Sequence, residues 1–199
     1  MGLTPLKNKV DVSISCWEWK MGESKAGKFS GARCKISKWI RIDSRSQPMQ
    51  AKSAANYSNA ALARVEALKA GYDEAIMLNN KGHVAEGSAE NIFVVKNGKI
   101  TTPPLSADIL NGITRDSAIQ MIKSNGKKIS EKNITVKNLL SADEIFMTGT
   151  AAEVKSVTRV NRTKIGSGKI GPITKELQSS FMDAVMGKNK KFLSWLKFL

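Results

Sequence analysis

The spacing of apolar residues changes period several times along this chain, and this limits the folds that it can adopt. The stretch "NYSNAALARVEALKAG" (56–71) carries apolar residues at helical spacing, whereas "DEAIML" (73–78) and "NIFVVK" (91–96) are short apolar runs of strand length. The dipeptide Asn97-Gly98 is typical of a tight hairpin turn. Hairpins with interspersed helices favour an α+β fold over a doubly wound parallel sheet.

Three helices are predicted where an apolar face precedes a glycine. The first runs from about Tyr57 to Lys69, the second opens at Gly112, and the third has Pro172 at its first helical position. The expected stop signals are Gly71, Gly126 and Gly187. The apolar faces comprise Leu62, Val65 and Leu68 in the first helix, Ile119 and Ile122 in the second, and Ile173, Leu177, Phe181 and Val185 in the third.

Composition divides the chain into four parts. Residues 1–19 end in "KVDVSISCWEW", whose alternation predicts the last strand of a small domain that is otherwise missing. Residues 20–31 have the Gly, Ser and Lys content of a linker. Residues 32–187 would form the main domain, beginning with a strand in "ARCKISKWIRI" (32–42). Residues 188–199 would be a basic tail, either disordered or a short helix.

The strong positive charge is spread thinly along the chain. Lys and Arg number 32 against 17 Asp and Glu, but the lysines stand mostly alone and no aromatic residues alternate with them. A solvated lysine-rich surface is therefore favoured over a nucleic-acid site. Cys16 and Cys34 form no disulfide framework and fit a reducing cytosol, so a cytoplasmic location is expected. The longest charge-free stretch, about 11 residues, is too short to span a membrane.

Reactive residue types stand at boundaries between predicted elements, where loops carry function. Lys52, in "QAKSAANY", precedes the first helix. A lysine in a confined apolar setting has a lowered pKa and can form a Schiff base, although position alone favours an ordinary exposed lysine. Thr114 in "NGITRD" and Thr150 in "TGTAA" place hydroxyl groups at turns, the first where free helix N–H groups attract anions. Helix capping and a tight turn are the simpler alternatives.

Two glutamates, Glu86 and Glu90, stand among small residues in "AEGSAENIF" (85–93). By default each would be a capping or surface acid. Pyridoxal phosphate requires a Schiff-base lysine, an anion site and an acid facing its ring nitrogen. It would also gain from a donor near its phenolic oxygen, and Tyr57 follows Lys52 at short spacing. Together these segments suggest pyridoxal phosphate as the cofactor, and no metal is expected.

From about residue 10 to residue 187 the chain resembles the C-terminal part of the branched-chain amino acid aminotransferases, in the class IV pyridoxal-phosphate-dependent family. The motifs that carry the resemblance are "QAKSAANYSNAALARVEALKAGYDEAIML", "GHVAEGSAENIFVV", "TPPLSADILNGITRD", "ADEIFMTGTAAEV" and "GPIT". The family also includes D-amino acid aminotransferases and aminodeoxychorismate lyases. "GTAAEV" with the long "GPITKELQ" ending favours the branched-chain branch.

The resemblance implies a D-amino acid aminotransferase-like large domain with hairpin-rich sheets and interspersed helices. It implies transamination of leucine, isoleucine and valine with 2-oxoglutarate, through a lysine Schiff base and a quinonoid intermediate. The expected partners are small amino acids and 2-oxo acids, together with a second copy of the chain in a dimer or larger homo-oligomer. No nucleic acid and no membrane are expected.

Carried over position by position, the resemblance gives each candidate residue a role. Lys52 would hold the cofactor and move a proton, and Glu86 would pair with the pyridine nitrogen. Glu90 and Asn91 would support these groups. The remaining contacts would be Tyr57 with the phenolic oxygen, Leu110 with the ring, the Ile113 backbone, Thr114 and Thr150 with the phosphate, and the N–H groups of Thr150 and Ala151 with the substrate carboxylate.

The chain departs from the family pattern in ways that leave alternatives open. The family's small domain, which supplies an arginine to the phosphate and much of the substrate pocket, is expected to be missing. Asn111 stands where the family often has proline, which loosens that turn. The alternatives are a lyase or D-amino acid aminotransferase relative, or a truncated, catalytically inactive fragment.

Overall fold

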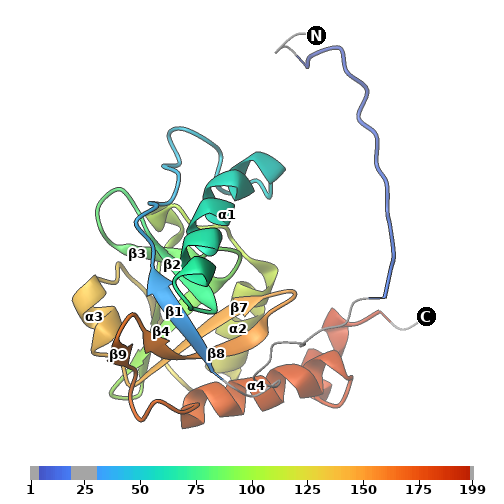
Figure 1. Cartoon of the computed structure of the whole chain (residues 1–199). Coiled ribbons are helices and arrows are strands. Elements are labelled where there is room, and N and C mark those ends of the chain that lie inside the picture. Colours follow the sequence, from blue (N-terminus) through green and yellow to red (C-terminus); the bar gives the residue numbers. More distant parts are fainter. Residues whose placement is uncertain (1–4, 19–30, 198–199) are drawn as a thin grey trace.

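The computed structural model of the chain describes residues 5–18 and 31–197, and the second range forms one body of strands and helices (Figure 1). The strands are β1 (Ala32–Ile36), β2 (Glu74–Leu78), β3 (Val84–Gly87), β4 (Asn91–Lys96), β5 (Lys99–Thr102), β6 (Ile129–Glu131), β7 (Glu144–Gly149), β8 (Glu153–Val160) and β9 (Thr163–Lys164). The helices are α1 (Ala54–Lys69), α2 (Ile113–Ser124), α3 (Val136–Leu140) and α4 (Pro172–Val185), with short 3-10 helices η1 (Leu105–Ala107) and η2 (Lys190–Trp195).

Within the described ranges the strands form one mixed sheet. Its order is β3-β2-β1-β8-β7-β4-β5-β6, and β9 pairs with β8. Antiparallel hairpins β4–β5 and β7–β8 stand beside the parallel pairs β1–β2, β1–β8 and β5–β6. Asn97 and Gly98 close the β4–β5 hairpin with φ values of 49° and 71°, which is the left-handed turn that their sequence predicts. The predicted α+β class is confirmed.

Both faces of the central strands are buried. Phe93 and Val95 of β4 belong to a cluster with residues of α2 and α4, and the Phe93 ring stacks on Phe146 at 4.7 Å between centroids. Ile92 and Val94 of the same strand point to a second cluster shared by several other strands and by Leu139 of α3. The sheet is therefore held from two sides, which gives a rigid support for the residues at its edges.

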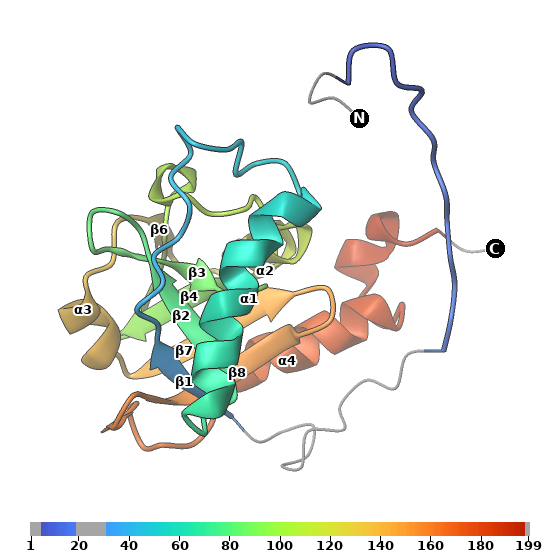
Figure 2. The ribbon, with the colours of Figure 1, turned by 45° about the horizontal axis from the view of Figure 1, so that its top comes forward.

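Helix α1 confirms the first predicted helix, but its buried face is not the predicted one. Leu62, Val65 and Leu68 are about half exposed, at 48%, 48% and 51%. The residues that pack on β2 are small: Ala60, Ala63 and Ala67 contact Ala75 and Met77. Alanine lets the helix backbone lie close to the sheet, whereas leucine would hold it away. Figure 2 shows α1 lying over the part of the sheet that contains β1 and β2.

Helices α2 and α4 follow their predicted patterns with one exception. Ile119, Ile122 and Leu177 are buried, and Ile173 and Phe181 pack against the same cluster. Val185, the last residue of α4, is half exposed at 50%. The helix ends there, so the final position of the predicted apolar line lies beyond the sheet edge that the helix covers.

The strand predicted for residues 32–42 ends at Ile36. Ser37 interrupts it, because its hydroxyl accepts the N–H of Trp39 and donates to Glu66, a local pattern that competes with strand pairing. The chain nevertheless stays beside β2, where the N–H of Arg41 donates to the Leu78 carbonyl at 2.7 Å. The sequence interpretation also missed β3 and most of β8.

The predicted N-terminal strand does not form in residues 9–18. Val10, Val12 and Ile14 are exposed, and no strand of the described ranges pairs with them. A strand requires a neighbour for its backbone groups, so alternation without a partner is not sufficient. The linker predicted for residues 20–31 lies, except for Gly31, outside the described residues. The four domain limits remain predictions.

In the basic tail, residues 190–195 form the short helix η2, the second of the two expected states. Phe192 is buried against the cluster that contains α2 and α4, and its ring lies 4.4 Å from that of Trp195. Among the described residues, no helix is long and apolar enough to cross a membrane.

Candidate active site

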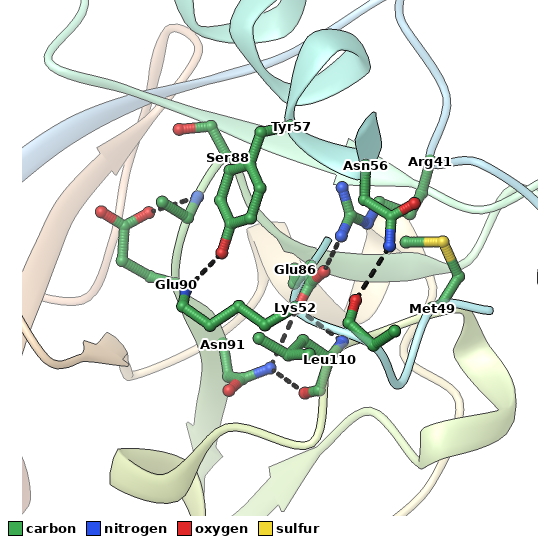
Figure 3. Close-up of a pocket in the computed structure, with 12 residues that line it drawn as sticks. Arg41, Met49, Lys52, Asn56, Tyr57, Glu86, Ser88, Glu90, Asn91 and Leu110 are labelled. Atoms are coloured by element: carbon green, nitrogen blue, oxygen red, sulfur yellow. Dashed lines mark hydrogen bonds and ion pairs between the residues drawn. The ribbon is translucent and has the colours of Figure 1, made fainter. Parts of the chain in front are cut away.

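Segments far apart in the sequence meet at one open pocket (Figure 3). Counted out to its mouth, the pocket holds about 360 Å³, within the range of small-molecule sites. Its lining comes from the loop before α1, the first turn of α1, β3 with the turn that follows, the start of β4 and the loop before α2. The lining residues are Arg41, Met49, Ala51, Lys52, Asn56, Tyr57, Glu86, Ser88, Ala89, Glu90, Asn91 and Leu110.

The Glu86 carboxylate lies at the inner end of this pocket and is 4% exposed. Its Oε1 accepts from Nη2 of Arg41 at 2.8 Å. Its Oε2 accepts from Nδ2 of Asn91 at 2.9 Å and from the N–H of Leu110 at 3.2 Å. A carboxylate offers about four lone-pair positions, so these three donors leave room for one more.

Two opposing effects act on the ionisation of Glu86. Burial raises its pKa to about 7, and the negative charge of Glu90 adds to that rise. The positive charge of Arg41 and the hydrogen bonds from Leu110 and Arg41 act in the opposite direction, because they favour the charged form. Glu86 is therefore balanced between its neutral and charged forms near neutral pH.

Lys52 lies at the mouth of the pocket. Its Nζ donates to the Tyr57 hydroxyl at 2.5 Å, and its position is fixed from behind because Asn56 Nδ2 donates to the Ala51 carbonyl at 3.0 Å. Gln50 ties the same loop to the Ile109 carbonyl at 3.2 Å. The confined setting expected for Lys52 is not formed by the described residues, which leave this side chain exposed.

The loop before α2 is held against Glu86 by Asn91. The Asn91 amide donates to the Leu110 carbonyl at 2.9 Å as well as to Glu86. A Cβ at Gly112 would collide with Asn91 Oδ1, so only glycine permits this approach. Figure 3 shows the Asn91 amide between the two groups that it joins. Loop and carboxylate therefore form one unit.

Helix α2 begins directly after this loop and lacks a side-chain cap. By contrast, Ser53 caps α1 and Thr135 caps α3. At α4 the buried Glu144 carboxylate accepts the N–H groups of Ile173 and Thr174, at 3.1 and 2.8 Å. Among the α-helices of the described ranges, α2 alone leaves its first N–H groups open to an anion from outside.

The turn between β7 and β8 lies beside the pocket. A Cβ at Gly149 would come within 3.3 Å of the Ala89 carbonyl, and Ala89 lines the pocket. Thr150 and Ala151, the next residues along this turn, are exposed. The segments "EGSAEN" and "TGTAA" are thus neighbours in space, as a shared site requires.

The structure brings some of the predicted site residues together more closely than others. Lys52, Tyr57, Glu86 and Leu110 line the pocket. The others lie on the adjoining α2 start or on the β7–β8 turn: Ile113, which is 85% exposed, Thr114, which is buried, and Thr150 and Ala151. The individual roles of all these residues remain predictions.

Glu90 also lines the pocket, but its contacts differ from those of Glu86. Its Oε2 accepts the N–H of Ala89 at 3.1 Å, and burial raises its pKa. A Cβ at Gly87 would lie 2.8 Å from that same oxygen, so the carboxylate folds back onto its own turn. This geometry fits a support for the β3–β4 turn.

Sequence reasoning missed Arg41 and Asn56. Arg41 is 7% exposed and contacts Glu86 directly, yet in the sequence it is one of 32 basic residues at the end of an alternating run. Asn56 is 3% exposed and holds the carbonyl before Lys52. A polar residue in the first turn of a helix was the available signal for Asn56, but Arg41 offered none.

Comparison with known proteins gives this arrangement a class. The model of the family described as "Amino-transferase class IV" matches residues 2–160. The chain therefore belongs to the class IV aminotransferase family.

Relatives within this family share one name. A probable branched-chain-amino-acid aminotransferase of Aquifex aeolicus is 50% identical over 167 residues, which cover 83% of this chain and 54% of that protein. Two crystal structures of a branched-chain amino acid aminotransferase from the source abbreviated "T.th." are similar. One, with pyridoxamine 5′-phosphate, has a TM-score of 0.86 at 41% identity and covers 92% of this chain and 59% of that one. The other, complexed with N-(5′-phosphopyridoxyl)-L-glutamate, has a TM-score of 0.83 at 42% identity and covers 85% and 56%. The chain thus spans little more than half the length of these relatives.

The balance at Glu86 predicts a pH-dependent stability. With a folded pKa of about 7, above the ordinary 4.5, the folded state binds the extra proton. This contribution is fully present below about pH 4.5 and is lost as pH rises through 7; at about 1.4 kcal/mol per pKa unit it amounts to roughly 3 kcal/mol. Denaturant titrations from pH 5 to 8 should show a fall in the free energy of unfolding that Glu86→Gln lacks.

The matched control is Glu18→Gln, which changes an exposed glutamate. It should keep the wild-type slope. A wild-type slope that survives Glu86→Gln would show that another group carries the proton.

Proposed function

We propose that this chain carries the cofactor-binding site of a pyridoxal-phosphate-dependent aminotransferase acting on branched-chain L-amino acids with 2-oxoglutarate as acceptor. The observation that carries the proposal is the pocket itself. A buried carboxylate with one free acceptor position lies at its inner end, and a lysine amine lies at its mouth.

The residues present fit the proposed cofactor. Glu86 keeps an acceptor position for a ring N–H, since three donors occupy its two oxygens. The uncapped start of α2 follows the Leu110–Gly112 loop that Glu86 and Asn91 anchor, so an anion site adjoins the ring site. An acid partner, an anion site and an amine are the three groups that pyridoxal phosphate requires.

When bound, pyridoxal phosphate supplies an aldehyde for amines and an electron-withdrawing ring. Lys52 is the amine that would hold it, and once free the same amine would move the proton at the substrate α-carbon. Tyr57, now bonded to Lys52, would orient that amine and donate to the phenolic oxygen. Glu86 would keep a positive charge on the ring nitrogen by pairing with it.

The anion contacts are assigned on the same basis. The Ile113 backbone N–H and Thr114 at the uncapped start of α2 would bind the phosphate, together with Thr150 from the β7–β8 turn. The N–H groups of Thr150 and Ala151 would receive the substrate carboxylate, and Leu110 would pack on the ring. The neighbouring positions of Gly149 and Ala89 support this arrangement, because they bring that turn to the pocket.

The substrate assignment rests on relatives. The "T.th." enzyme is named for branched-chain amino acids, and one of its structures contains a phosphopyridoxyl derivative of L-glutamate, the amine that 2-oxoglutarate becomes. Product analysis with leucine, valine, D-alanine and aminodeoxychorismate separates this function from its lyase and D-specific alternatives. A pyruvate-releasing activity on aminodeoxychorismate without transamination of leucine would favour the lyase.

Attachment at Lys52 is the direct test of the site. Incubation with pyridoxal phosphate followed by borohydride reduction should fix the cofactor on the peptide containing Lys52, as read by mass spectrometry. Lys52→Ala should abolish the label, whereas Lys81→Ala, at another exposed lysine, should not. A folded wild-type chain that takes no label at Lys52 would support the inactive-fragment alternative.

The two pocket glutamates should respond differently to substitution. Glu86→Gln should retain the label at Lys52 but lower leucine transamination by on the order of 10²-fold, because the charge partner of the ring nitrogen is lost. Glu90→Gln should cost less than about tenfold, or about 1.4 kcal/mol, because Glu90 contacts its own turn. Steady-state rates with both variants decide this, and equal losses contradict the division of roles.

A homo-oligomer in the cytoplasm completes the proposal. The half-exposed apolar residues Leu62, Val65 and Leu68 of α1 give a surface that a second copy could cover. Both cysteines are free, and Cys34 is buried, as suits a reducing compartment. Small amino acids and 2-oxo acids would be the other partners, without nucleic acid or membrane. A sedimentation measurement that gives the mass of a single chain at all concentrations would contradict the oligomer.

A further inference from the structure

Arg41 touches the site but has no role in the function proposed above. Its side chain is only 8% exposed, with Nη2 at 2.8 Å from Oε1 of Glu86. Its backbone N–H donates to the Leu78 carbonyl, so β2 fixes where the side chain starts. In Figure 3 the guanidinium lies directly behind Glu86, on the side away from Lys52.

We propose that Arg41 is a positioning residue that acts through Glu86: its permanent charge keeps the Glu86 carboxylate ionised and turned toward the pocket. What the ionised carboxylate meets there, a protonated ring nitrogen, rests on the proposed function. The ionisation itself does not depend on it and can be measured on the protein without cofactor.

The groups facing Glu86 show why Arg41 carries this role. On Oε2, Asn91 from β4 and the Leu110 N–H from the loop before α2 are neutral donors. Glu90, in the turn after β3, is an acid that opposes ionisation. Lys52 shares the pocket, but its amine is bonded to Tyr57. Within the described residues, Arg41 is the cation that contacts this carboxylate.

The chemistry of the guanidinium suits a permanent charge. Arginine does not lose its proton in proteins, so the charge on Oε1 is constant across the working pH range. Its Nε and Nη1 are buried without a partner in the described residues, which leaves Glu86 as the group that offsets the burial of this cation. Each partner therefore requires the other to be charged.

Without this charge, burial would leave Glu86 protonated at neutral pH. A neutral carboxylic acid can share a hydrogen bond with a pyridine nitrogen but no longer favours a positive charge on it. Arg41 would thus control the ring's electron-withdrawing power without touching the ring.

The test compares Arg41→Lys, which keeps a charge, with Arg41→Gln, which keeps donors but no charge. Isotope-edited infrared spectra of the cofactor-free proteins follow the carboxyl band of Glu86 with pH, with Glu86→Gln as the blank. Arg41→Gln should raise the titration midpoint by about 1 to 3 pH units, the usual effect of a lost arginine neighbour, and Arg41→Lys should raise it less. Equal midpoints in the wild type and both variants overturn the proposal.

Glu90→Gln is the control of opposite sign. It removes a negative neighbour and should lower the Glu86 midpoint. A rise in this variant would show that the band reports local rearrangement rather than charge, and would overturn the proposal.

Loss of folding does not remove the test. If Arg41→Gln is unstable, it should still fold at about pH 5.5, where Glu86 is neutral and needs no cation, and unfold near pH 8. A variant equally unfolded at both pH values would show a packing role for Arg41 and overturn the proposal.

The loaded enzyme gives a separate readout. Arg41→Gln should lower kcat for leucine by on the order of tenfold or more with little change in KM, and Arg41→Lys should recover part of the loss. A wild-type chain that takes no label at Lys52 would end the proposed function, whereas the infrared titration would still decide the role of Arg41.

Discussion

The buried Glu86 carboxylate is the interaction on which the rest of the site depends. Its two oxygens join three segments through Arg41, Asn91 and the Leu110 N–H. A buried charge without partners is too costly to persist, so these contacts must form together or the acid must become neutral. The loop after β1, strand β4 and the loop before α2 are thereby fixed relative to one another around a single charge.

The two ends of the pocket differ in rigidity. Glu86 lies on β3, inside a sheet packed on both faces, and every group around it is anchored. Lys52 lies on a loop and is exposed, with Tyr57 as its contact. A reactive amine must exchange partners during turnover, whereas the acid that tunes a ring must not move, so this division fits the proposed chemistry.

Elements with local signals were predictable from the sequence, and elements defined by distant contacts were not. Asn97-Gly98 fixes the β4–β5 hairpin by its own backbone preference, and Pro172 marks the start of α4 in the same way. Strand β3 was missed because its glutamate is buried, against the rule that acids face solvent. The buried face of α1 was misassigned because close packing selected alanine over leucine.

The site shows the same limit at the level of single residues. The resemblance named Lys52, Tyr57, Glu86 and Leu110, and the fold places these four in one pocket. It could not name Arg41, which stands in a basic stretch and gains its meaning only where β2 carries it behind Glu86. Sequence patterns therefore locate the groups that would touch a cofactor, but the charge that sets their ionisation is a property of three-dimensional packing. An acid that must be both buried and ionised needs a buried cation, and finding that cation requires the structure.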